Sequence, residues 1–210
     1  MRAKTRRVYY FIRRDAQLRS LTSARRQDIL DRLTASGPAS VREIARMIGA
    51  QPSALYHHVK QLLALGLVVP AGHRVVRRKR EALYATPAPR MRWIKALAEP
   101  RHRELFVEIA AAMCRQLNRD FGDGSRSDRA RASGPARNWS VARLVGAPTP
   151  RTLARINRHL AAIAELLWSS PADGANIISF GWVMAPVGKS RPRKPPGRGR
   201  RARRPGAARR

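Results

Sequence analysis

Two short amphipathic segments on either side of a glycine, between residues 40 and 65, restrict the fold of this chain more than any other feature. Ser40-Val41-Arg42-Glu43 has the spacing of a capping box, which predicts that a helix begins there. Gly49 ends that helix, and Pro52 suits the first turn of the next one. Apolar residues recur three or four positions apart in both segments: Val41, Ile44, Ala45, Ile48, Leu55, Val59, Leu62 and Leu63. These faces need a further element against which they can be buried.

Flanking segments supply that element. Residues 22–35 predict a helix whose inner face carries Ile29, Leu30 and Leu33, and Gly37-Pro38 ends it. After Gly66, residues 67–69 and 82–85 predict two short strands around a cationic tip, residues 70–81. The fold class that follows is mainly α with a small β-wing. Residues 21–88 form a winged helix-turn-helix domain, and a smaller helical C-terminal domain follows it.

A helix-turn-helix with a basic hairpin presents one helix to the major groove of DNA while the hairpin reaches along the backbone. Residues 51–65 are the predicted recognition helix, and residues 70–81 are the predicted wing on the backbone. Polar side chains of the helix can contact base edges and phosphates, and wing cations can neutralise phosphates. The predicted DNA-binding residues are Ser40, Gln51, Ser53, Tyr56, His57, Lys60, Gln61, Arg74, Arg77, Arg78, Lys79 and Arg80.

Charge favours the same class of partner. The chain has 44 Lys and Arg against 13 Asp and Glu, a formal net charge of +31 over 210 residues. Such an excess indicates a polyanionic partner, of which nucleic acid is the first candidate. Residues 189–210 hold 11 basic residues and no acid, so the preceding residues are strongly basic in their own right. A compositional bias of the genome is the plain alternative source of part of this arginine.

The rest of the chain divides by composition. Residues 1–20 predict a basic N-terminal arm, and residues 91–187 predict a helical dimerisation or effector domain with a mobile loop at 122–137. Thr149-Pro150 begins a helix with a heptad-like seam, and residues 176–185 suit a buried strand. Residues 188–210 are a basic tail expected to be disordered. The seam is formed by Leu153, Ile156, Leu160, Ile163 and Leu167. It is either a dimer contact or packing inside the domain.

Several residues admit more than one interpretation. His57 and His58 are adjacent and lack a Cys or carboxylate cluster, so DNA contact and packing are favoured over metal binding. Cys114 is expected to be a buried, inert thiol rather than a redox switch. Trp93, Trp139, Trp168, Phe180 and Trp182 could line a pocket for a small-molecule effector, although large aromatic residues usually fill cores.

Other classes of protein find little support. The acids are few and scattered, without a nucleophile-elbow, phosphate-loop or metal-hydrolase signature, so we expect no enzyme, no cofactor and no metal. A single cysteine excludes an intramolecular disulfide and fits the cytoplasm. No apolar run is long enough for a membrane span or a signal-peptide core.

Two segments carry a resemblance. Residues 40–45, followed by Leu55-Tyr56-His57-His58-Val59-Lys60-Gln61-Leu62 and Gly66-Leu67-Val68, resemble the ArsR-like winged helix-turn-helix regulators. More weakly, residues 137–167 and 178–186 are similar to the C-terminal region of uncharacterised members with this type of domain. The resemblance implies a cytoplasmic, nucleoid-associated homodimeric repressor that reads an inverted repeat in double-stranded DNA. The thiolate motif of the family's metal sensors is absent, because Leu55-Tyr56-His57 stands there instead, so metal sensing is not implied.

The tail also resembles a DNA-binding motif. Its Arg198-Gly199-Arg200 segment is similar to an AT-hook, but Arg201 replaces the proline of the motif, which favours a generic polycation. Two other functions stay open for the whole chain. One is an architectural, nucleoid-type protein that coats DNA without a defined operator. The other is a winged helix that binds RNA or another protein.

Overall fold

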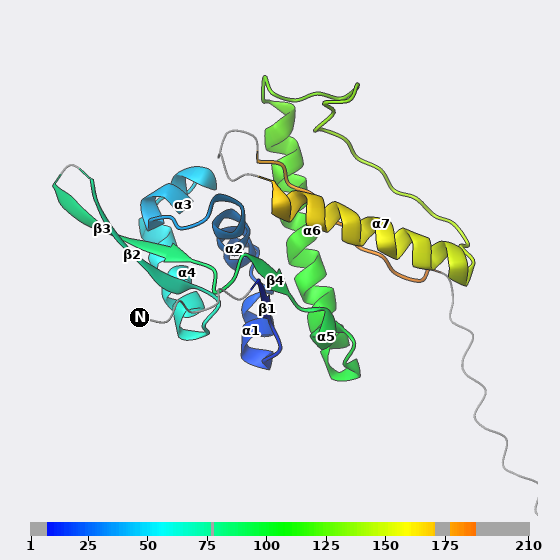
Figure 1. Ribbon diagram of the computed structural model, residues 1–210, viewed down its shortest axis with the longest axis horizontal. Helices are drawn as coiled ribbons and strands as arrows, with labels where there is room; N and C mark the ends of the chain where they lie inside the picture. The colour runs from blue at the N-terminus through cyan, green and yellow to red at the C-terminus, as the bar shows by residue number, and fades with distance from the viewer. Residues whose placement is uncertain (1–7, 77, 171–176, 188–210) are drawn as a thin grey trace, which may run out of the picture.

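The computed structural model describes residues 8–76, 78–170 and 177–187, and over these residues the chain is mainly α-helical with small β elements (Figure 1). β1 pairs with β4 in parallel, and β2 pairs with β3 in an antiparallel hairpin. The elements in chain order are β1 (Tyr9–Phe11), α1 (Asp15–Ser20), α2 (Ala24–Ser36), α3 (Val41–Met47), α4 (Ser53–Ala64), β2 (Val69–Val76), β3 (Lys79–Ala85), β4 (Arg90–Arg92), α5 (Ile94–Leu97), the 3-10 helix η1 (Pro100–His102), α6 (Arg103–Ser125) and α7 (Pro150–Ser169).

Helices α2, α3 and α4 pack together around the faces that the apolar periodicity predicts. The inward residues are all less than 6 % exposed: Ile29, Leu30, Leu33, Val41, Ile44, Ala45, Leu55, Val59 and Leu62. The capping box of α3 is also present, since the Ser40 hydroxyl accepts from the Glu43 amide and the Glu43 carboxylate accepts from the Ser40 amide at 2.9 Å. Gly49, with φ of 62°, makes the turn between α3 and α4 in the left-handed region that favours glycine.

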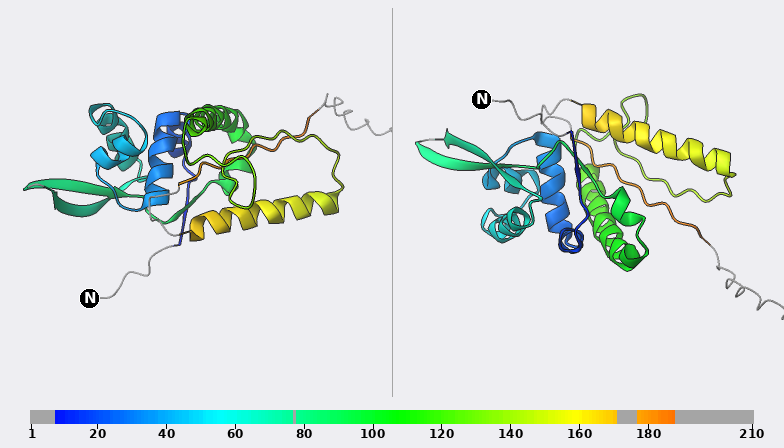
Figure 2. Two further views of the ribbon diagram at one scale, coloured as in Figure 1. Left: turned by 90° about the horizontal axis from the view of Figure 1, so that it is seen from above. Right: turned by 60° about the horizontal axis from the view of Figure 1, so that its bottom comes forward.

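The β2–β3 hairpin is longer than predicted. Pairing runs from Val69 opposite Ala85 to Val76 opposite Lys79, so most of the predicted tip is strand. Gly72 does not make the turn; it lies in β2 at a register shift, and Arg78, with φ of 63°, lies at the turn instead. An isolated bridge between Ala39 and Tyr84 joins β3 to the connection between α2 and α3. The far end of the hairpin projects away from the helices (Figures 1 and 2).

The N-terminal segment is an integral part of the fold rather than an arm. β1 lies alongside β4, far away in the sequence, and α1 follows it directly. Ile12 and Leu18 are at most 1 % exposed and belong to the same core as α2–α4. The basic composition of residues 1–20 concealed these apolar anchors, and residues 1–7 lie outside the described part of the chain.

α6 packs against α2 and shares its core. Phe106 and Ile109 join the central hydrophobic cluster, and the Gln27 amide donates to the Ile109 carbonyl oxygen at 3.1 Å. The core therefore continues across residues 88–91, where a domain boundary was expected. α6 also extends to Ser125, so the irregular segment starts later than the loop predicted at residues 122–137. Cys114 on this helix is exposed, contrary to the expectation of a buried thiol, because it faces away from α2.

The C-terminal part is the most open. α7 begins where predicted, with the Thr149 hydroxyl accepting from the Thr152 amide at 3.2 Å, but none of its twenty residues is buried. The prediction of a buried strand at 176–185 is wrong: residues 177–187 pair with no strand among the described residues and are largely exposed. Periodicity alone could not reveal that no partner strand exists for this segment. The described helices include none with the length and apolar character needed to cross a membrane.

Candidate nucleic-acid interface

The outer face of α4 and the residues before it form a polar, accessible surface. Tyr56 is 57 % exposed, while Leu55 beside it is fully buried, so the helix separates sharply into two faces. The contacts between α4 and both α2 and α3 fix which face looks outward. Five of the predicted contact residues are exposed together here: Gln51, Ser53, Tyr56, His57 and Lys60.

Two other predicted contact residues have their polar groups engaged within the chain. Ser40 is only 3 % exposed, and its hydroxyl caps α3. The side-chain oxygen of Gln61 accepts a hydrogen bond from Arg26 at 2.7 Å, which links α4 to α2. Arg26 also donates to the Ser20 carbonyl oxygen at 2.7 Å. Both predicted residues therefore support the position of the exposed face.

The far end of the hairpin carries the accessible cations. Arg78, Lys79 and Arg80 are exposed, and Arg80 donates to the His73 ring nitrogen Nδ1 at 3.3 Å. Val75 on the same hairpin is 74 % exposed, so an apolar side chain stands among these charges. Arg77, which the sequence also placed in this group, lies outside the described residues.

Arg74 differs from the other hairpin cations because carboxylates surround it. Its guanidinium lies 2.6 Å from the Glu43 carboxylate and 3.7 Å from that of Glu81. Arg42 completes the network with a 3.1 Å contact to Glu81. The network connects α3 to the hairpin and balances the charge of Arg74 locally. Sequence analysis missed these roles of Arg42 and Glu81, which depend on how the hairpin lies against α3.

His57 and His58 have different surroundings. His57 is exposed, whereas His58 is partly buried, and burial together with the nearby Arg26 lowers the pKa of His58. The rings lie 5.9 Å apart at 66°. No group of three or more potential metal-ligating side chains occurs in the part of the chain that the structure describes. His57 thus belongs to the exposed face and His58 to the contact between α4 and α2.

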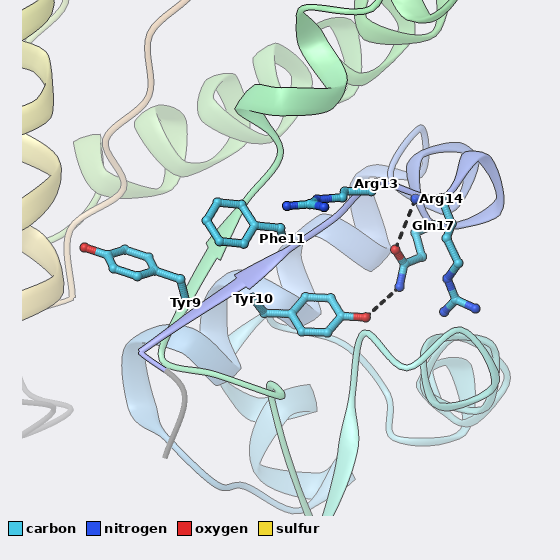
Figure 3. Close-up of a pocket in the computed structure, with 6 residues that line it drawn as sticks. All are labelled: Tyr9, Tyr10, Phe11, Arg13, Arg14 and Gln17. Atoms are coloured by element: carbon cyan, nitrogen blue, oxygen red, sulfur yellow. Dashed lines mark hydrogen bonds between the residues drawn. The ribbon is translucent and has the colours of Figure 1, made fainter. Parts of the chain in front are cut away.

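The C-terminal end of α4 is held by the N-terminal segment. Arg14 and Gln17 both donate to the Leu65 carbonyl oxygen, at 2.5 and 3.0 Å, and Gln17 also donates to the Tyr10 hydroxyl at 2.8 Å. These residues border an open hollow of about 400 Å³ beside β1 (Figure 3). It is lined by Tyr9, Tyr10, Phe11, Arg13, Arg14 and Gln17. No local pattern in the sequence indicated this anchor, because it joins residues about fifty positions apart.

The aromatic residues proposed as an effector pocket do not gather in one place. Trp139 stacks on Phe121 at 4.8 Å, Phe180 contacts Trp182 at 5.8 Å, and Trp168 lies against arginines of β4. Neither of the two hollows found among the described residues is lined by any of the five. The idea of a common pocket for these residues is therefore wrong.

The fold and this surface define a mainly α-helical protein in which an exposed polar helix lies beside a cationic antiparallel hairpin. The sequence model of the HVO_A0114 family matches residues 21–78, which span α2, α3, α4 and β2. No curated protein matches the chain. The match thus covers the segment that carries the candidate interface and leaves out the C-terminal helices.

Proposed function

We propose that this protein is a sequence-specific regulator of transcription that binds double-stranded DNA through a winged helix-turn-helix. In this proposal α2, α3 and α4 are the helical unit, α4 is the recognition helix, and the β2–β3 hairpin is the wing. The resemblance to ArsR-like regulators supports the same function, and the protein acts in the cytoplasm on chromosomal DNA.

One observation carries the proposal. The exposed face of α4, with Gln51, Tyr56 and Lys60, lies in the same unit as a hairpin whose far end carries Arg78, Lys79 and Arg80. The major groove is about 12 Å wide and admits one α-helix, so this helix can approach base edges while the hairpin contacts phosphates. Among the described residues of the hairpin, only Glu81 is acidic, and it is engaged by Arg42 and Arg74.

The residues divide into two roles. Gln51 can form a bidentate pair with adenine, and Ser53, Tyr56 and His57 can donate to bases or phosphates. Lys60 and the cations of the hairpin neutralise phosphates and so give affinity that falls with salt. The first group would set sequence preference, and the second group would set overall affinity.

A homodimer that acts as a repressor is part of the proposal. Two copies related by a twofold axis would place their recognition helices in successive major grooves, about one helical turn apart. The seam of α7 is the candidate contact, because Leu153, Ile156 and Leu167 are each more than a third exposed in the single chain. Exposed apolar surface of this kind marks an interaction site more often than it occurs on a monomer.

The alternative function is that of an architectural protein that coats DNA without a defined operator. The observation that favours it is the net charge of +31, much of which lies outside the candidate interface. Binding of this kind depends on counterion release and shows little preference for sequence.

Selection of bound duplexes from a random DNA pool, at near-physiological salt, tests the proposal. The protein should lack residues 189–210, so that their charge does not mask the preference of the folded part. We expect enrichment of an inverted repeat with half-sites about one helical turn apart. A pool without enrichment, together with binding that collapses as salt rises, would support the architectural function instead. Efficient competition by duplex RNA would contradict both.

A further inference from the structure

A carboxylate from α7 is held between β1 and β4 by groups typical of an anion site. The two oxygens of Glu165 lie 2.6 Å from Arg90 Nη1 and 3.0 Å from Arg92 Nη2. The Tyr9 hydroxyl donates to Glu165 Oε1 at 3.4 Å and accepts from Arg90 at 2.9 Å. Three donors from two strands therefore converge on a single carboxylate.

The strand geometry explains why an anion is needed there. Arg90 and Arg92 are two positions apart on β4, so their side chains extend from the same face of the strand. Both guanidinium groups lie over the rings of Tyr9 and Trp168, with distances of 4.5 to 5.6 Å to the ring centroids. Two stacked, partly buried cations at this distance repel each other unless an anion lies between them. Nε of Arg92 is buried without a hydrogen-bond partner among the described residues.

Glu165 is a weakly held occupant of this site. Its side chain remains 42 % exposed, and it belongs to a helix that has no buried residue within Pro150–Ser169. The arginines are less exposed, at 20 % for Arg90 and 35 % for Arg92. The cationic half of the contact thus belongs to the core-bound β1–β4 pair, and the anionic half belongs to a peripheral helix.

We propose that Arg90, Arg92 and Tyr9 form a binding site for a small organic carboxylate, which Glu165 fills as a tethered internal ligand. A free carboxylate that takes the same two guanidinium contacts displaces Glu165 and releases the C-terminal turn of α7. A carboxylate is favoured as the ligand because both oxygens of the resident group are used, each by a different arginine, in a planar arrangement. This inference concerns a site away from α4 and the hairpin, and it does not depend on DNA binding.

The internal ligand predicts an unusual gain of binding on mutation. When a tethered competitor occupies a site about nine-tenths of the time, the apparent Kd of a free ligand rises about tenfold. Calorimetric titration of the full chain with sodium benzoate, in a low-chloride buffer without DNA, should therefore show binding to E165Q that is at least about tenfold tighter than to the wild-type protein. Benzamide, which has the same shape without the charge, should show no gain.

Matched variants separate this site from general attraction to a basic protein. E108Q removes the same charge from an exposed position on α6 and should leave benzoate binding as in the wild type. Adding either R90Q or R92Q to E165Q should abolish the gain, and circular dichroism would identify any variant that does not fold. Equal binding of benzoate by E165Q and wild type would overturn the proposal, as would a gain that persists in both double variants.

Discussion

At the scale of single residues, the face of α4 divides those that bind from those that support. Gln51 and Lys60 are exposed with no printed partner role in the core, whereas Gln61 on the same helix accepts from Arg26. The distinction matters for mutagenesis, because truncation of Gln61 would disturb the packing of α4 on α2 as well as any contact with DNA.

Substitution of Gln51 and of Lys60 should have different consequences for DNA binding. Q51A should relax base preference at one position, with a loss of about 1–3 kcal/mol against the preferred base, because a bidentate contact disappears. K60A should weaken all duplexes alike and lower the salt slope by about one. Fluorescence anisotropy with preferred and scrambled duplexes measures both effects. Unchanged binding by both variants would place the recognition surface elsewhere.

Ser40 belongs to the supporting group, and its effect should appear in stability. Replacement by alanine removes the cap of α3 and leaves a buried amide of Glu43 without its acceptor, which should lower the free energy of unfolding by about 1 kcal/mol. Urea denaturation measures this change. S53A, at an exposed position of α4, is the matched control and should stay within about 0.5 kcal/mol of the wild type. A reversed order of the two effects would contradict the assignment.

At the scale of elements, a buried histidine joins α1 to the start of α6. His102 is 2 % exposed, and its two ring nitrogens each lie 3.0 Å from an acceptor, the Ala96 carbonyl oxygen and the Asp15 carboxylate. Only the doubly protonated ring can donate to both. These contacts raise the pKa of His102, and the hydrogen bond from His102 lowers the pKa of Asp15. Glu99 and Arg101 also face the pair.

The contribution of His102 to stability should therefore depend on pH. A raised pKa in the folded state stabilises the fold fully below the ordinary histidine pKa, and this stabilisation is lost as pH rises through the raised value. The lowered pKa of Asp15 stabilises above the ordinary carboxyl range and loses its effect as pH falls through the lowered value. Urea unfolding at pH 5.5 and pH 9 should show a larger advantage of wild type over H102Q at pH 5.5. H159Q, on the exposed α7, is the control, and an advantage that grows toward pH 9 would refute the assignment.

At the scale of the whole molecule, the two ends of the chain differ in how they are held. β1 and α1 contribute buried residues to the core, while α7 and residues 177–187 leave large apolar side chains exposed. Figure 2 shows α7 and the following segment on the side of the molecule away from the hairpin. A second copy can therefore contact α7 without obstructing the proposed DNA-binding surface.

The oligomeric state tests the role of the α7 seam. Sedimentation equilibrium at micromolar concentration should give a dimer of the 23.5 kDa chain, and I156R should weaken association at least about tenfold because it places like charges in the seam. N157R adds the same charge at the neighbouring position and should leave the dimer intact. A monomeric wild-type protein, or an I156R variant that associates as the wild type does, would contradict the proposed contact.

Local patterns in the sequence determined much of the helical unit. The capping box at Ser40, the glycine turn at Gly49 and the apolar spacing of α2, α3 and α4 act over a few residues, so they can be read without knowledge of the fold. The exposure of Gln51, Tyr56 and Lys60 follows from the same periodicity.

Only the tertiary structure decided which distant segments meet. The pairing of β1 with β4, the seat of Glu165 between Arg90 and Arg92, and the contact of His102 with Asp15 join residues 73 to 87 positions apart or pair strands from opposite ends of the core. The length of the hairpin and the exposure of residues 177–187 likewise depend on whether a partner strand is present. Backbone pairing and ion pairs between distant segments depend on the packing of the whole core, which no short window of sequence contains.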